Sequence, residues 1–198
     1  MPAKTLSYDG SAIFGYYSRM LLAALISLSV VLRLLQLGDN SLWLDEMTSL
    51  EVAQHSFSQI LLGQAFNNHT PPFYYLILHL WLKIAPATEI GLRSLSVFFD
   101  VAAQLSLYCL TVKYLSRRIA LISSLLYSVS PFLVYYAQEG RMYSLLLFIC
   151  LLCWHFTNRV IEQRSPKDAA LLTLLLVTGL YTHYYFPFFV ASLFISSI

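Results

Sequence analysis

Charged side chains are scarce in this chain of 198 residues. Asp, Glu, Lys and Arg together make up 11% of it, whereas hydrophobic residues make up 58%; a typical soluble domain holds about 25% charged residues. A soluble globule of this length could not bury so much apolar surface or cover itself with so few charges. The composition therefore excludes a soluble enzyme and a disordered chain. With a net charge of only +2, it also excludes a nucleic-acid partner bound through a basic surface.

Motifs for nucleotide or zinc binding are also lacking. The chain has 7 glycines, and none of them belongs to a phosphate-binding loop, a Walker motif or a Gly-x-Ser-x-Gly elbow. The three cysteines, Cys109, Cys150 and Cys153, all lie in apolar runs, where a thiol lacks the electropositive, hydrated surroundings that activate a redox pair. We therefore expect these cysteines only to pack against their neighbours.

Long apolar runs are what the sequence has in abundance, and several approach the length of a membrane-spanning helix. They cover residues 20–37, 71–86, 93–112, 119–136, 142–158 and 169–187, and a further apolar stretch, 188–198, follows the last. We predict an all-α, polytopic transmembrane fold with about five full spans and a partial sixth. The first run extends beyond any small-residue cleavage site, so we expect it to remain as a signal anchor.

Basic residues fall into three blocks, which set the orientation of the chain in the membrane. These blocks comprise Lys4 with Arg19, then Lys113 with Arg117 and Arg118, and finally Arg159 with Arg164 and Lys167. All three blocks, and with them the N-terminus, are predicted to be cytoplasmic. The turn at residues 138–141 is then external.

The segment that follows the first run carries charges of the opposite sign. Residues 38–70 contain four acidic residues and no Lys or Arg, which suits the external side. An odd number of crossings must lead from there to the Lys113 block, yet two apolar runs intervene. The run 71–86 is the weaker span, because it is short, opens with two prolines and carries His79 and Lys83. We predict that it lies at the outer interface, within a first external loop from 38 to 92 that contains interfacial helices.

Asp45 and Glu46 are the first candidates for chemistry on the external face. They lie just after the first span, where Ser41 could cap a short helix beginning at Trp43, with both acids in its first turn. One interpretation is that they are only helix-capping acids in a solvated loop. The other is that a carboxylate here acts as a general base that takes a proton from a hydroxyl group.

Further charged and aromatic residues converge on the same face. Arg93 has a planar fork suited to a phosphate, while an Arg–Asp structural pair involving Asp100 is the alternative use of an intramembrane arginine. Glu139 and Arg141 belong to the external turn and could form no more than a salt bridge there. His69 could bind a phosphate or a metal beside Asp45, or could simply be solvated. His183, in the sequence Tyr-Thr-His-Tyr-Tyr, could equally be a histidine of the interfacial aromatic belt.

Five short pieces in this order resemble the integral-membrane GT-C glycosyltransferases of the protein-mannosyltransferase and aminoarabinose-transferase type. They read Ser-Leu-Trp-Leu-Asp-Glu (41–46), His-Thr-Pro-Pro-Phe-Tyr-Tyr-Leu (69–76), Leu-Arg-Ser-Leu-Ser (92–96), Ser-Pro-Phe-Leu-Val-Tyr-Tyr-Ala-Gln-Glu-Gly-Arg-Met-Tyr-Ser (130–144) and Tyr-Thr-His-Tyr-Tyr (181–185). Each piece alone is weak, but five in register over residues 38–187 make a specific match.

The resemblance implies a polyprenyl-phosphate-linked sugar as donor, an acceptor hydroxyl, and inverting transfer on the non-cytoplasmic face. Asp45 corresponds to the acid–base aspartate of the family, with Glu46 as its partner. Donor-phosphate or substrate binding then falls to Arg93, Glu139, Arg141, His69, His183 and Tyr143. Some members bind a divalent cation at this place, although this sequence has no recognisable ligand set for one.

Members of this group are longer than this chain, which stops inside an apolar run. We therefore expect residues 1–198 to be the N-terminal transmembrane module of such an enzyme, residing in a bacterial plasma (inner) membrane. Two alternatives remain at this point: a non-enzymatic carrier or flippase-like subunit that moves lipid-linked sugars, and an inactive fragment.

Overall fold

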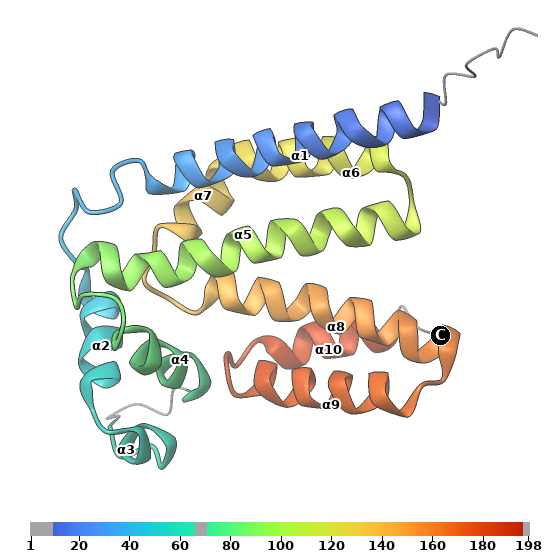
Figure 1. Ribbon diagram of the computed structural model, residues 1–198. Helices are drawn as coiled ribbons and strands as arrows, with labels where there is room; N and C mark the ends of the chain where they lie inside the picture. Colours follow the sequence, from blue (N-terminus) through green and yellow to red (C-terminus); the bar gives the residue numbers. More distant parts are fainter. Residues whose placement is uncertain (1–9, 66–70, 196–198) are drawn as a thin grey trace, which may run out of the picture.

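The computed structural model describes residues 10–65 and 71–195, which form ten helices and no strand (Figure 1). In chain order the helices are α1 Gly10–Leu34, α2 Leu44–Gln54, α3 Phe57–Leu61, α4 Phe73–Trp81, α5 Glu89–Tyr114, α6 Arg117–Val129, α7 Pro131–Ala137, α8 Tyr143–Gln163, α9 Pro166–Leu180 and α10 Phe186–Ile195. The all-α prediction is confirmed within this part of the chain.

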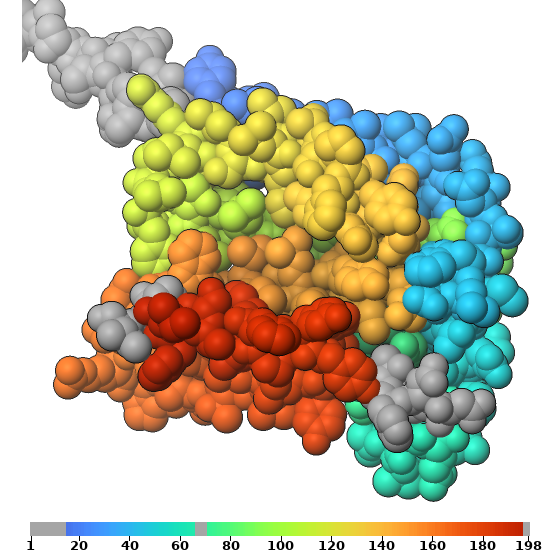
Figure 2. Space-filling model, turned by 180° about the vertical axis from the view of Figure 1, so that it is seen from behind, coloured from blue at the N-terminus to red at the C-terminus, as the bar shows by residue number. Residues whose placement is uncertain are grey.

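The long helices lie side by side and reverse direction from one to the next along the chain, so that the neighbours α1 and α6 run the same way (Figure 1). The short helices α2, α3 and α4 gather at one end of them. We call this the loop end and the opposite one the basic end. Figure 2 shows the face formed by α6 and α7 in yellow, α8 in orange and α10 in red. Large apolar side chains such as Val31, Ile122 and Phe188 are exposed, as expected of helices that meet lipid rather than water.

The predicted number of spans is too high. Three helical stretches are long and apolar enough to cross a membrane: Gly15–Leu34, Glu89–Tyr114 and Tyr143–Gln163. A fourth is reached only if α6 and α7, which are bent by 62° at their junction, count as one span. The described residues therefore contain three or up to four candidate spans, not five with a partial sixth.

Local sequence explains why the runs 119–136 and 169–187 do not form full spans. The run 119–136 breaks at Ser130, whose hydroxyl caps α7 by accepting from the Leu133 N–H, and at Pro131, which occupies the first turn of α7. Proline suits that position but interrupts a continuing helix. The run 169–187 forms α9, which stops at Leu180 after 15 residues; at 1.5 Å per residue it reaches about 22 Å, short of the roughly 30 Å hydrocarbon core.

The basic end collects the second and third basic blocks. They lie where α5 leads into α6 and where α8 leads into α9 (Figure 1), and Lys113 and Glu162 join these two places at 3.4 Å. The run 71–86 contributes only α4, with nine residues, at the loop end. The second and third basic blocks therefore share one end of the helices, and α4 lies at the other.

Two clusters hold the helices together. An apolar core joins the loop end to the bundle, and it includes Tyr74 and Leu78 of α4, Leu92 and Leu95 of α5, Leu145 of α8 and Phe186 of α10. A buried polar cluster joins α1, α5 and α6: the Arg33 guanidinium is paired with the Asp100 carboxylate, and the Tyr127 hydroxyl donates to Asp100 at 2.9 Å.

Asp100 therefore does form an Arg–Asp structural pair, and its partner is Arg33. Arg93, two turns before Asp100 in the same helix, binds elsewhere. The side-chain amide of Gln104 extends the polar cluster by donating to Ser124 and Ser128 at 2.9 and 2.8 Å. Charged and polar groups at this depth thus pair with one another across three helices, although the Gln104 Oε1 and the Ser29 hydroxyl have no partner in the described chain.

Candidate functional site

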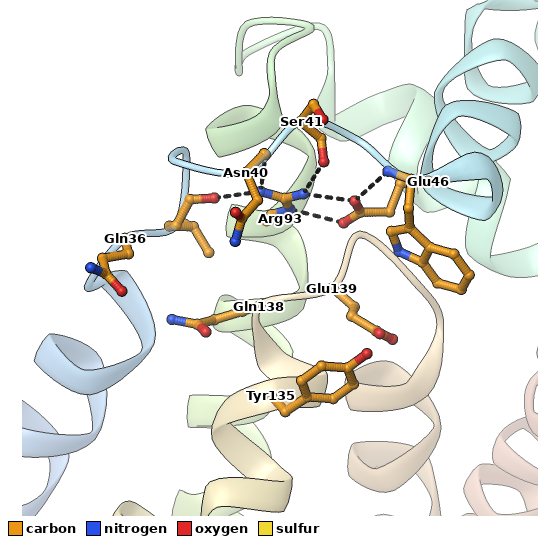
Figure 3. Close-up of a pocket in the computed structure, with 10 residues that line it drawn as sticks. Gln36, Asn40, Ser41, Glu46, Arg93, Tyr135, Gln138 and Glu139 are labelled. Atoms are coloured by element: carbon orange, nitrogen blue, oxygen red, sulfur yellow. Dashed lines mark hydrogen bonds and ion pairs between the residues drawn. The ribbon is translucent and has the colours of Figure 1, made fainter.

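Arg93 lies in the first turns of α5, at the loop end, and all five of its N–H groups are used. Its Nε and Nη2 donate to the two carboxylate oxygens of Glu46 at 2.9 and 2.8 Å. Its Nη1 donates to the carbonyls of Leu37 and Asn40 at 2.8 and 2.9 Å, and its Nη2 also to the carbonyl of Ser41 (Figure 3). The guanidinium therefore fastens the loop that follows α1 to the start of α5.

Glu46 is the counterpart of this arginine and is fully buried. Besides Arg93, its carboxylate accepts from the Gly140 N–H at 2.7 Å and from the Trp43 N–H at 3.4 Å. Burial acts to raise the pKa of Glu46, but the hydrogen bonds and charge of Arg93 and the Gly140 N–H outweigh it and leave the pKa below its ordinary value. We call Glu46, Arg93 and Gly140 the loop lock.

Gly140 fits the loop lock because it carries no side chain. A Cβ at this position would lie 2.5 Å from Leu92 and 3.3 Å from the Glu46 carboxylate. The turn at residues 138–141 can approach Glu46 closely enough for its backbone N–H to donate only because this position is glycine. The lock therefore joins α2, α5 and the turn before α8, three segments that are distant in sequence.

These contacts revise two expectations from the sequence. Ser41 does not cap a helix starting at Trp43; α2 begins at Leu44, with Trp43 as its N-cap residue, and the Ser41 carbonyl binds Arg93. Glu46 and Arg93 also hydrogen-bond to each other. In this structure Glu46 therefore has no free lone pair for a substrate proton, and Arg93 has no free N–H for a phosphate.

Asp45 has the opposite environment from its neighbour. Its side chain is 45% exposed, and one carboxylate oxygen lies 3.5 Å from Nη2 of Arg141, whose own side chain is 12% exposed. Arg141 is held in place by donating to the Asp45 carbonyl at 3.1 Å and to the Ser49 hydroxyl at 3.0 Å. Its Nε is buried and has no hydrogen-bond partner in the described chain. The result is an accessible carboxylate beside a fixed cation.

The salt bridge between Glu139 and Arg141, one of the two interpretations of their turn, is not formed; Arg141 lies beside Asp45 instead. Glu139 is largely buried, and its carboxylate points toward the Tyr135 hydroxyl (Figure 3). Burial raises the pKa of Glu139 above its ordinary value; the Tyr135 hydroxyl lowers it in part, and the charge of Glu46 raises it further. Glu139 is therefore a second carboxylate at the loop end, with properties unlike those of Asp45.

Tyr143 and His183 are brought together, with ring centres 6.0 Å apart. Tyr143 also packs edge-on against Tyr136 at 4.9 Å, and Nδ1 of His183 accepts from the Tyr185 N–H at 3.1 Å. These residues form an aromatic row at the loop end of α7, α8 and α9. His69, the remaining predicted residue, lies outside the described residues.

Sequence reasoning missed several polar residues that face the same end of the molecule. Gln36, Asn40, Tyr135 and Gln138 line a pocket together with Glu46, Arg93 and Glu139. Tyr135 and Gln138 belong to the motif at residues 130–144, which already marks their neighbourhood. Gln36 and Asn40 belong to no recognisable motif, so the sequence gives no reason to choose them. Within the described residues, no group of three or more His, Cys, Asp or Glu side chains is placed to hold a metal ion.

Comparison with known proteins gives one family. Residues 69–197, close to two thirds of the chain, match the family described as dolichyl-phosphate-mannose-protein mannosyltransferase. The match includes Arg93, Glu139, Arg141 and His183 and begins after Asp45 and Glu46. Searches of curated proteins and of solved structures gave no significant match. The extent of the family match shows that this chain belongs to the dolichyl-phosphate-mannose-protein mannosyltransferase family.

Proposed function

We propose that this chain carries part of the active site of a membrane glycosyltransferase. The reaction is transfer of a sugar from a polyprenyl-phosphate-linked donor to an acceptor hydroxyl on the non-cytoplasmic face of a bacterial plasma membrane. The observation that carries the proposal is the accessible Asp45 carboxylate beside Arg141, at the end of the helices away from the second and third basic blocks. The family supplies the donor class, and the basic blocks supply the orientation.

The proposed chemistry is a single displacement at the anomeric carbon. Asp45 accepts the proton of the acceptor hydroxyl while the hydroxyl oxygen forms the new bond to the anomeric carbon. The bond from that carbon to the phosphate oxygen breaks, and the lipid phosphate leaves with the electron pair. Arg141 is the cation placed to stabilise the charge that develops on the phosphate. Backside attack inverts the anomeric configuration.

Positioning is the role that we propose for Glu46 and Arg93. Their ion pair, together with the Gly140 N–H, holds α2 against the external turn that carries Arg141. Asp45 and Arg141 are consequently kept within 3.5 Å of each other by a buried, fully satisfied contact. Preorganisation of this kind lowers the cost of reaching the reactive geometry.

The carrier alternative receives no support from the described residues. It required the intramembrane charges to act on a substrate, whereas Arg33 is paired with Asp100 and Arg93 with Glu46.

Donor turnover tests the proposal directly. The longest natural chain containing this sequence is expressed in membranes and supplied with radiolabelled polyprenyl-phosphate sugars, mannose first. Changing Asp45 to Asn is expected to lower turnover by about 10²–10⁴-fold, since that is the usual contribution of a positioned base. Asp39→Asn, an exposed carboxylate in the same loop, is the matched control and should leave turnover unchanged. Undiminished turnover in Asp45→Asn would falsify the assignment.

A further inference from the structure

A polar pocket opens at the loop end, beside the loop lock. Its volume is about 310 Å³, near the lower limit of about 300–1,000 Å³ for ligand pockets, which suits one small ring rather than a lipid chain. Figure 3 shows it between the segment that follows α1 and the end of α7. We call it the loop–turn pocket. Its lining comprises Gln36, Leu37, Asn40, Ser41, Trp43, Glu46, Arg93, Tyr135, Gln138 and Glu139.

Several polar groups in this pocket are free to bind a ligand. The side-chain amides of Gln36 and Asn40 make no hydrogen bond within the described chain. Gln138 uses its Nε2 to donate to the carbonyls of residues 33 and 35 at 3.2 and 2.8 Å, which leaves its Oε1 available. Glu139 faces only the Tyr135 hydroxyl among the groups drawn (Figure 3). Amide, hydroxyl and carboxylate groups therefore converge on one small volume.

Charge excludes one class of ligand for this pocket. Arg93 is the one cation among the described residues that line it, and every N–H of Arg93 is used by Glu46 and three carbonyls. Glu139 instead adds negative charge. A phosphate placed here would meet the Glu139 carboxylate and, within the described lining, no unpaired cation to offset its charge. A neutral ligand with several hydroxyl groups fits, because amides both donate to and accept from hydroxyls and a carboxylate accepts from them. The Trp43 ring offers an apolar face for the C–H side of a sugar.

A left-handed residue follows the end of α1. Gln36 has φ of 59°, a conformation with which helices commonly end and which Arg164 adopts at the end of α8. At Gln36 it turns the chain out of α1 and places this residue in the pocket wall.

We propose that the loop–turn pocket binds a single neutral sugar ring, through Glu139, Gln138 and the two free amides, with Trp43 against one face of the ring. The inference rests on the proposed function, since it names a substrate subsite of the same transferase. The sugar ring has two sources, a saccharide acceptor or the sugar of the lipid-linked donor. The described lining supplies no unpaired cation for the donor's phosphate, which we place outside the pocket.

Binding is measured on the full natural chain in lipid nanodiscs, without any transfer reaction. The protein is labelled with 5-fluorotryptophan, and the 19F resonances of Trp43, Trp81 and Trp154 are assigned by Trp→Phe variants. Methyl glycosides of common hexoses and pentoses are titrated first, followed by the corresponding sugar 1-phosphates. Trp154, in α8, serves as the internal control because it does not line the pocket.

We expect at least one methyl glycoside to shift the Trp43 resonance saturably and leave that of Trp154 unchanged. Glu139→Gln should weaken this binding at least about tenfold, since it replaces a charge-assisted hydrogen bond; Glu51→Gln, an exposed carboxylate of α2, should not. Tighter binding of the methyl glycoside assigns the ring to the acceptor, and tighter binding of the sugar 1-phosphate assigns it to the donor.

The two proposals fail in different ways. If no sugar shifts Trp43 in a protein whose donor turnover depends on Asp45, the pocket assignment is overturned and the proposed function stands. If Trp43 responds to a sugar but the protein turns over no lipid-linked donor, the pocket assignment stands and the proposed function is overturned. Asp45→Asn should abolish turnover and retain the Trp43 shift, because Asp45 does not line the pocket.

Discussion

Asp45 and Glu46 are adjacent in the sequence but lie in opposite environments. The Glu46 side chain is fully buried, and the Asp45 side chain is 45% exposed. Because successive residues of a helix point about 100° apart, one of two neighbouring acids in α2 faces the molecule and the other faces out. The sequence predicted the pair as candidates for chemistry, but it could not tell which carboxylate meets Arg93, since that depends on how α2 is rotated against α5.

The buried member of the pair should determine stability. Glu46→Gln leaves the Arg93 guanidinium buried without a counter-charge, and the free energy of unfolding should fall by about 3 kcal/mol, as for other broken buried ion pairs. Thermal unfolding in detergent measures this change. Glu51→Gln, the exposed control in the same helix, should shift the midpoint little; equal shifts in the two variants would count against the loop lock.

Acid should remove the same contribution. The pKa of Glu46 is lower in the folded protein than its ordinary value of 4.5, so its stabilisation is complete well above pH 4.5 and is lost as the pH falls through the folded pKa. The stability gap between the wild type and Glu46→Gln should therefore narrow below about pH 4.5. Glu139 titrates in the opposite sense, and because the Glu46 charge raises its pKa, Glu139 offsets part of this change. A gap that stays constant from pH 7 to pH 3 would contradict this assignment.

At the scale of the helices, the length of an apolar run was a good predictor of helix formation and a poorer predictor of membrane crossing. The runs 20–37, 93–112 and 142–158 correspond to the three candidate spans. The run 119–136 was read as continuous although it contains Ser130 and Pro131, the two residues that cap and start α7. One serine and one proline hardly change the mean hydropathy of a run, whereas the missing N–H of proline interrupts a helix.

Partners between helices were the least predictable feature. Arg33 and Asp100 are far apart in sequence, and only the packing of α1 on α5 and α6 brings them together. Asp100→Asn should lower the free energy of unfolding by about 3 kcal/mol, because Arg33 would then be buried without its counter-charge. Replacing both residues by Leu should recover much of the loss, since an apolar pair avoids the desolvation of both charges. A double variant as unstable as the single one would argue against the pair.

At the scale of the whole molecule, the loop lock joins a segment outside the family match to the matched region. The match begins at residue 69, yet Glu46 of α2 binds Arg93 of α5 and the turn before α8. The loop that carries Asp45 is thereby fixed to the part of the chain that the family defines. The described chain therefore places a carboxylate and an arginine together at one end of a set of membrane helices.

The orientation of this set has its own test. A cysteine at Ser58, in α3, should react with an impermeant maleimide added outside intact cells, because the loop end is predicted to be external. A cysteine at Gln163, at the end of α8, should react only after the membrane is opened. The wild-type protein controls for the three native cysteines. The reverse pattern would place Asp45 on the cytoplasmic side and contradict the proposed orientation.

Turnover per folded molecule separates a catalytic residue from a positioning residue. It therefore tests most directly the proposal that Asp45 is the catalytic base and Glu46 a positioning residue. Donor turnover and the unfolding midpoint are measured together for the wild type, Asp39→Asn, Asp45→Asn and Glu46→Gln. The account predicts that Asp45→Asn keeps the wild-type midpoint and loses about 10²–10⁴-fold in turnover, whereas Glu46→Gln loses stability first. An Asp45→Asn protein that is stable and turns over the donor at the wild-type rate would contradict it.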